Sequence, residues 1–94
     1  MSFEWNDDKQ AENLKKHGVD FVDAVRIFRD PNRIEDYDAE HSKEEDRWWT
    51  IGACDDRTLF VVYTLRSKDT TVRLISARKA TKNEAKEYHA RRAG

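Results

Sequence analysis

The chain has 94 residues, of which 39% are charged and 37% hydrophobic, with a formal net charge of −1. This length suits one small domain with a modest core, which leaves no room for a deep cofactor cavity. The one cysteine excludes an internal disulfide, and no apolar run approaches the roughly 20 residues that span a bilayer. We therefore expect a single domain over residues 1–94, soluble and cytoplasmic.

The small net charge hides an asymmetry along the chain. Residues 1–54 carry 8 Lys and Arg against 14 Asp and Glu, a balance of −6, whereas residues 55–94 carry 10 against 5, a balance of +5. A basic second half indicates a site for a polyanion or an acidic partner. The alternative is that opposite charges simply mix in the folded domain.

The first half of the chain predicts a short strand followed by two helices. Residues 3–5 alternate apolar and polar side chains, as an edge strand does. Residues 7–17 follow a helix pattern, with acidic side chains in the first turn, lysines in the last, and Gly18 just after it. Asp20 is placed to cap a second helix, which must end near Asp30 and Pro31.

The second half predicts four strands and a last helix. A weak strand pattern over residues 33–37 precedes the acidic segment 38–45, which we expect to be an exposed loop. Residues 46–54, 59–65 and 71–77 are apolar or β-branched and separated by short turns, which predicts an antiparallel three-stranded meander. Thr81 and Glu84 form a capping box that starts the final helix. The order β-α-α-β-β-β-β-α defines an α+β fold.

The stretch 72–81 is the most informative, because cations are built into its strand. An unpaired guanidinium in a buried strand is costly, so Arg73, Arg78 and Lys79 either face solvent or bind an anion. Strict alternation puts Arg73 and Arg78 on opposite faces. They converge only if the strand bulges or ends near Ser76.

The residues that carry chemistry match no common metal, phosphate-loop or triad pattern. The three histidines are far apart, there are no paired thiols, and the three glycines form no phosphate-binding pattern. What remains is a set of cations, hydroxyls and an aromatic on the predicted sheet, with two histidines on flanking segments: Arg47, Tyr63, Arg66, Arg73, Ser76, Arg78 and Lys79, with His17 and His41.

Such a set suits RNA cleavage without a metal ion. Attack by the 2′-hydroxyl needs a base to remove its proton, a cation to stabilise the charge on phosphorus, and an acid for the 5′-oxygen. Arginine serves the second task, because its fork matches phosphate oxygens and stays charged, and histidine serves the other two. Aromatic side chains stack on unpaired bases. The same residue types would also form a plain nucleic-acid-binding surface.

Six ordered segments stand out along nearly the whole chain: FEWN at 3–6, NLKKHGV at 13–19, FRDP at 28–31, DRWWTIG at 46–52, VYT at 62–64 and RLISARKAT at 73–81. Together they resemble the BrnT family of bacterial type II toxins. The resemblance implies a RelE-like fold, a compact antiparallel or mixed sheet with two N-terminal helices on one side and a C-terminal helix. It implies a ribonuclease that arrests growth, neutralised by a BrnA-like antitoxin that carries a DNA-binding domain.

The leading hypothesis combines the residue chemistry with this resemblance. Arg66 and Arg78 stabilise the phosphate, and His17 or Lys79 transfers protons. The other matched positions bind RNA: Lys16, Arg47, Tyr63, Arg73 and Ser76. His41 lies in the acidic loop, which argues against a catalytic role. No metal or other cofactor is expected.

A second hypothesis is a noncatalytic interaction module, because the sequence offers no unambiguous acid/base pair. Its basic sheet face would bind an acidic protein or RNA. A DNA-binding protein in its own right is disfavoured, since no helix combines a firm apolar face with a base-reading face. The expected partners are RNA and the antitoxin, in a hetero-oligomer that reaches operator DNA only through the antitoxin, with no membrane.

Overall fold

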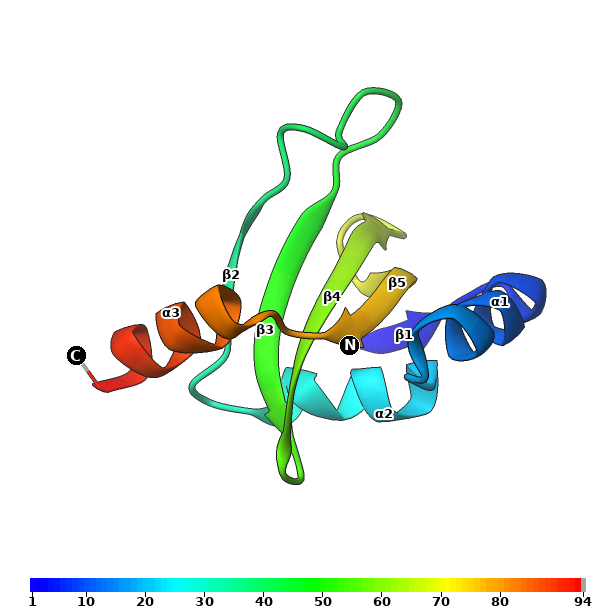
Figure 1. Cartoon of the computed structure of the whole chain (residues 1–94). Helices are drawn as coiled ribbons and strands as arrows, with labels where there is room; N and C mark the ends of the chain where they lie inside the picture. The colour runs from blue at the N-terminus through cyan, green and yellow to red at the C-terminus, as the bar shows by residue number, and fades with distance from the viewer. Residues whose placement is uncertain (94) are drawn as a thin grey trace.

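The computed structural model describes residues 1–93, and its strands form one five-stranded mixed sheet in the order β1-β5-β4-β3-β2 (Figure 1). β1 pairs in parallel with β5, and the other neighbours are antiparallel. The strands are β1 (Ser2–Glu4), β2 (Ile34–Tyr37), β3 (Trp48–Cys54), β4 (Arg57–Arg66) and β5 (Thr71–Lys79). The predicted α+β class is confirmed, and β3, β4 and β5 form the predicted meander.

Capping residues set the ends of the helices. The Asn6 side chain caps α1 (Asp7–His17) by accepting from the Lys9 amide, and Gly18 ends it in the left-handed region at φ 70°. Asp20 caps α2 (Phe21–Arg26), which continues as the 3₁₀ turn η1 (Ile27–Arg29). Thr81 and Glu84 exchange the two hydrogen bonds of a capping box at the start of α3 (Lys82–Ala93).

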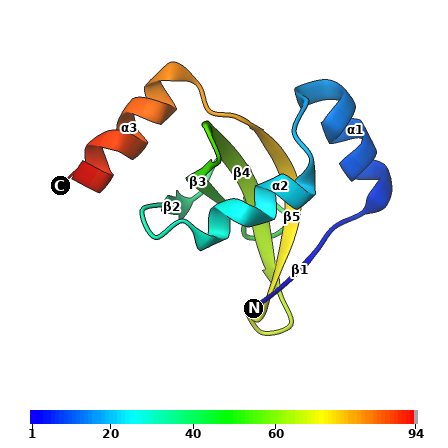
Figure 2. The same cartoon turned by 90° about the horizontal axis from the view of Figure 1, so that it is seen from below.

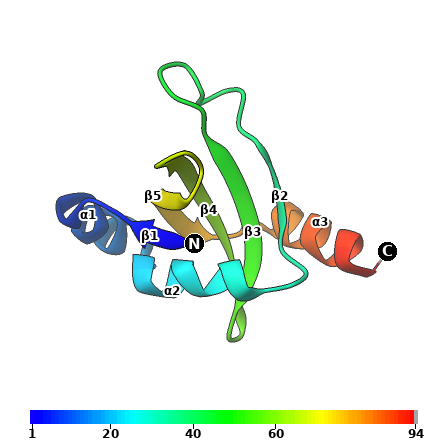
Figure 3. The ribbon, with the colours of Figure 1, turned by 180° about the vertical axis from the view of Figure 1, so that it is seen from behind.

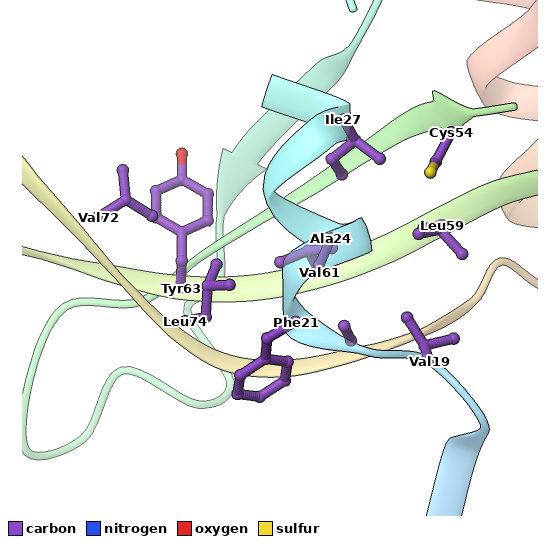
Figure 4. Close-up of a cluster of buried hydrophobic side chains, with 11 residues drawn as sticks. Val19, Phe21, Ala24, Ile27, Cys54, Leu59, Val61, Tyr63, Val72 and Leu74 are labelled. Atoms are coloured by element: carbon purple, nitrogen blue, oxygen red, sulfur yellow. The ribbon is translucent and has the colours of Figure 1, made fainter. Parts of the chain in front are cut away.

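The main core lies between α2 with η1 and one face of the sheet (Figure 4). Phe21, Ala24 and Ile27 face Leu59 and Val61 of β4, and all five are fully buried. Burying a large apolar side chain contributes about 1.5–3 kcal/mol, so this layer is the main support of the fold. Alternate residues of β4 thereby point toward the helices.

The opposite face of the sheet is covered only in part. Tyr88 of α3 packs on Ile34 of β2 and Ile51 of β3, and this smaller cluster is joined by Trp49 and Phe60. α1 and α3 lie at opposite ends of the molecule, as Figure 2 and Figure 3 show. The part of this face near β4 and β5, which we call the open face, is therefore left without a helix above it.

A β-bulge in β5 sets which side chains reach the open face. Val62 pairs with Ser76 but the next residue of β4, Tyr63, pairs with Leu74, so Ile75 is the extra residue. Leu74 and Ala77 are both buried toward the helices. Arg73 and Arg78 consequently share the open face with Ser76. The strand also runs to Lys79, two residues beyond the predicted 71–77, so Arg78 belongs to it.

Candidate active site

The open face carries a cavity of about 530 Å³ between the sheet, the loop before β3 and α3. Side chains from alternate positions of β3 and β4 form its floor, and Ser76 and Arg78 of β5 form one side. The loop and the helix supply the remaining walls. The lining residues are Asp38, Glu40, His41, Trp49, Ile51, Phe60, Val62, Ser76, Arg78, Glu84 and Glu87.

Arg78 is held rigidly at the edge of this cavity. Its Nη1 and Nη2 donate to the two carboxylate oxygens of Glu84 at 2.7 and 3.0 Å, and its guanidinium carbon lies 4.2 Å from the Phe60 ring centre. The hydrogen bonds from Arg78 lower the pKa of Glu84, and the same bonds raise the pKa of Arg78. The guanidinium of Arg78 is therefore fixed in place and stays charged. The carboxylate of Glu84 occupies the position at which a phosphate would bind.

His41 is oriented in the same cavity by Asp38. Its Nδ1 lies 2.9 Å from one carboxylate oxygen of Asp38, and the side chain of His41 is 60% exposed while that of Asp38 is 12% exposed. A carboxylate only accepts, so the shared proton belongs on Nδ1 and Nε2 is left for a ligand. The predicted exposed loop thus closes one wall of the cavity and presents a histidine to it.

Trp49 and Phe60 form a flat aromatic floor. Their ring centres are 5.8 Å apart with planes inclined by 20°, and both side chains are partly exposed. Arg78 lies over the Phe60 ring. Stacked rings beside a cation are a surface on which an unpaired base can stack.

Two arginines of the leading hypothesis lie outside this cavity, bridged by the loop. One carboxylate oxygen of Glu45 lies 3.1 Å from Nη2 of Arg66, and the other lies 3.7 Å from Nη2 of Arg47. All three side chains are about one-third to one-half exposed. The acidic segment is drawn onto the sheet by these ion pairs, so Arg47 and Arg66 anchor the loop that carries His41.

Three further predicted residues are also placed apart from the cavity. Arg73 is ion-paired with Glu4 of β1 at 2.5 Å. Tyr63 lies on the helix side, where burial, with the hydrogen bond to Glu35 at 2.9 Å, raises the pKa of its hydroxyl. Lys79 is exposed at the end of β5 and does not line the cavity.

Lys16 and His17 line a neighbouring groove of about 720 Å³ between α1 and the bulge of β5. Ser76 lines both hollows. In the structure, Ser76, Arg78 and His41 line the same cavity, and Lys16 and His17 line the adjacent groove. The Asp38–His41 pair was missed by sequence reasoning, although its spacing of three residues in a loop is a signal that could have found it.

The chain matches the family model described as "Ribonuclease toxin, BrnT, of type II toxin-antitoxin system" over residues 5–84. It belongs to this family. BrnT-family chains are ribonuclease toxins, and the type II system implies an antitoxin as partner. The resemblance read from the six sequence segments is therefore confirmed.

A solved structure supports the BrnT fold. The chain is similar to the 1.1 Å crystal structure of the Brucella abortus ribonuclease toxin BrnT, with a TM-score of 0.65 and 24% identity over 87% of this chain and 99% of that chain. At this identity the likeness establishes the fold alone. No curated protein matches the chain significantly.

Two negative findings concern the described part of this BrnT-family chain. Among residues 1–93, no three or more His, Cys, Asp or Glu side chains are grouped so that they could hold a metal ion. Within the same residues, no helix has the length and apolar character needed to cross a bilayer.

Proposed function

We propose that this toxin is an RNA endonuclease that needs no metal ion and cuts cellular RNA in the cytoplasm at the cavity of His41, Ser76 and Arg78. One observation carries the proposal: a fixed arginine fork and an Asp-oriented imidazole line the same cavity. The stacked Trp49 and Phe60 rings beside them support an unpaired base as the group bound there.

The arrangement assigns a role to each group. The free Nε2 of His41 takes the proton of the 2′-hydroxyl, whose oxygen then attacks the adjacent phosphorus. Arg78 stabilises the charge that develops on the phosphate oxygens, and the Ser76 hydroxyl donates a further hydrogen bond. The bond to the 5′-oxygen breaks, leaving a 2′,3′-cyclic phosphate, and the 5′-oxygen takes its proton from solvent, to which the cavity is open. His17 and Lys79, either of which transfers protons in the sequence hypothesis, do not line the cavity.

Glu84 has to leave the Arg78 fork before a phosphate can enter it. Both anions use the same two donors, and a bidentate phosphate matches this fork as well as a carboxylate does. The exchange leaves Glu84 with its capping hydrogen bonds at Thr81, which hold the start of α3. Substrate binding and the release of Glu84 are therefore one event.

The antitoxin partner is assigned to the BrnA-like class, in a hetero-oligomer that contacts operator DNA only through the antitoxin. Membership of a type II toxin family supports a protein antitoxin. The resemblance in the sequence supports its class. Co-expression with a BrnA-like protein from the neighbouring gene should restore growth, and a failure to form a complex would contradict this assignment.

The test of the ribonuclease proposal compares two arginines that both hold a carboxylate through two hydrogen bonds. Arg78→Ala removes the site cation, whereas Arg26→Ala removes an exposed fork on α2 that pairs with Asp55 far from the cavity. Wild type and Arg26→Ala should arrest growth, degrade RNA and cut purified RNA in EDTA, and Arg78→Ala should do none of these. A wild-type chain that causes neither growth arrest nor RNA loss contradicts the proposal.

A noncatalytic module is the second candidate, and one observation favours it. The fork of Arg78 is filled by Glu84, and carboxylates surround it in the cavity. Such a surface would bind its protein partner and leave RNA intact. Tight antitoxin binding together with no strand scission in purified RNA would decide for this candidate.

A further inference from the structure

The candidate active cavity is too acidic to hold RNA by itself. Four carboxylates line it, from Asp38, Glu40, Glu84 and Glu87, against the one guanidinium of Arg78, so its formal charge is −3 when His41 is neutral. Contacts to phosphate supply most of the affinity for nucleic acids. A substrate of this cavity therefore needs a second, cationic surface that continues from it.

The groove between α1 and the bulge of β5 has the required charge. Lys9, Lys15 and Lys16 line it together with a single carboxylate, that of Glu12, which gives a formal charge of +2. His17 stands at the same rim and adds charge when protonated. The groove, of about 720 Å³, is large enough for more than one nucleotide group.

The lysines of this groove can bind a phosphate without first losing a carboxylate partner, whereas the arginines on the sheet cannot. Among the described side chains, every ion pair has an arginine or a histidine as its cation, so these lysines form none there. Arg66, Arg73 and Arg78 each hold a carboxylate that a phosphate would have to displace. The exposed lysines Lys9 and Lys16 bind a phosphate without that cost.

The bulge joins the two hollows into one path. Ile75 is the extra residue of β5 and lines the groove, while Ser76, next to it, lines both the groove and the cavity. A strand of RNA that crosses Ser76 has one phosphate at Arg78 and its neighbours along α1. This path needs no movement of α1, because the groove is already open.

We propose that the groove along α1 is a second RNA-binding subsite, which holds the phosphates that flank the cut bond and supplies most of the affinity. The proposal rests on the RNA cleavage proposed above. It gives Lys16 the contact to RNA that the sequence predicted, and it moves His17 from catalysis to binding. The ligand class is the sugar-phosphate backbone of unpaired RNA.

The test replaces the groove lysines and keeps the helix. The variant Lys9→Gln with Lys15→Gln and Lys16→Gln is compared with a control of equal charge change, Lys68→Gln with Lys82→Gln and Lys86→Gln, whose residues line neither hollow. Binding is measured on a 12-nucleotide RNA with every 2′-hydroxyl methylated, which cannot be cut. Turnover is measured on a dinucleotide and on a 12-nucleotide RNA with free hydroxyls.

The groove variant should lose about tenfold or more in affinity for the 12-nucleotide RNA, with its salt slope reduced by about 2, at about 0.7 per lost contact. Its loss of kcat/KM relative to the control should be larger on the 12-nucleotide RNA than on the dinucleotide, because the dinucleotide does not reach the groove. An equal loss in the control, or no loss in the groove variant, overturns the proposal. So does tighter binding of an oligoglutamate peptide than of RNA by the wild type, since the groove would then be a protein-docking surface.

These readouts separate the two proposals. A wild type that cuts RNA while the groove variant binds and cuts it equally well contradicts the subsite alone. If the wild type cuts neither the dinucleotide nor the 12-nucleotide RNA, but the groove variant binds the methylated RNA more weakly than the wild type does, the ribonuclease proposal is contradicted. The subsite proposal is then still supported.

Discussion

Asn13 of α1 makes both backbone hydrogen bonds of Ala77 in β5. Its side-chain oxygen accepts from the Ala77 amide at 3.0 Å, and its side-chain nitrogen donates to the Ala77 carbonyl at 2.8 Å. β1 pairs with β5 only as far as Arg73, so the Asn13 amide takes the place of a missing edge strand. Because Ala77 stands between Ser76 and Arg78, one buried helix side chain fixes the backbone of the site.

Replacing Asn13 should therefore weaken both the fold and the reaction. Asn13→Ala leaves the backbone groups of Ala77 unpaired, along with the Val19 carbonyl that the same amide holds. An unsatisfied buried polar group costs about 1–3 kcal/mol, so the free energy of unfolding should fall by at least that amount. The rate constant kcat for RNA cleavage should fall as well, because the backbone between Ser76 and Arg78 is no longer fixed by Asn13. Both quantities are measured on the same protein, by urea unfolding and by initial rates.

Asn6→Ala is the matched control on the same helix. The Asn6 side chain caps α1 by accepting from the Lys9 amide, and loss of such a cap costs about 1 kcal/mol. Asn6 does not line the cavity, so this variant should lose stability and keep kcat. Equal losses of kcat in both variants would show that Asn13 acts only through the stability of the domain.

The Asp38–His41 pair predicts a loss of rate with little loss of binding. His41→Ala removes the group that accepts the 2′-hydroxyl proton and should lower kcat by about 10²–10⁴-fold, the usual contribution of a general base. Asp38→Asn should have a smaller effect of the same kind, because an amide can donate to Nδ1 and favour the other tautomer. Glu44→Gln, in the same exposed loop, is the control and should keep the kcat of the wild type. An unchanged kcat in His41→Ala would exclude His41 as the base.

The local signals in the sequence were sufficient for the helix ends and for the order of helices and strands along the chain. Asn6, Gly18 and Asp20 act on backbone groups within a few residues, so their caps follow from spacing alone. The bulge at Ile75 has no such signal, because an apolar β-branched residue fits a regular strand equally well. From the sequence we could say only that Arg73 and Arg78 share a face if the strand bulges or ends near Ser76. The strand register in the structure shows that it does bulge.

The site was harder to predict, since its parts meet through long-range ion pairs. The acidic segment 38–45 has no periodicity and reads as solvated, yet Glu45 ties it to Arg47 and Arg66. The Glu45–Arg66 ion pair joins residues far apart in the chain and has no local signature. It holds the loop that carries His41 against the sheet, whereas the charge of the neighbouring residues predicted a solvated loop.

The Arg78–Glu84 pair makes the stability of the domain depend on pH. Hydrogen bonds from Arg78 lower the pKa of Glu84 in the folded state, so the pair contributes stability above the unfolded pKa and loses it as the pH falls through the folded pKa. Glu84→Gln keeps a capping-box residue but removes the charge. The variant should be less stable than the wild type at pH 7, and the two should converge as the pH falls below about 4.

The same variant also tests Glu84 as the competitor of the phosphate. With the carboxylate gone, the Arg78 fork is free, and the affinity for methylated RNA should rise. Glu87→Gln is the control, because Glu87 lines the same cavity and pairs with Arg91 on an exposed helix face. Equal gains in both variants would mean that only the overall charge of the cavity matters.

Gly52 of β3 should tolerate no side chain, because η1 packs directly on it. A Cβ at this position would lie 2.9 Å from Cβ of Ile27, 3.2 Å from its carbonyl oxygen and 3.3 Å from Cβ of Arg33. Neither backbone nor Cβ atoms can swing away as the end of a long side chain would. Gly52→Ala should therefore lower the free energy of unfolding by about 1–3 kcal/mol, as overpacking does in a tight core.

Gly18→Ala should destabilise the domain for a different reason, and the contrast tests the packing argument. A Cβ on Gly18 meets nothing within 4 Å, but its φ of +70° strains alanine and most other residues with a Cβ by about 1–2 kcal/mol. Asn tolerates this left-handed conformation, so Gly18→Asn should recover part of the loss, whereas Gly52→Asn should be worse than Gly52→Ala. Urea unfolding of the four variants decides the matter, and a Gly52→Asn protein as stable as the wild type would mean that η1 can move off β3.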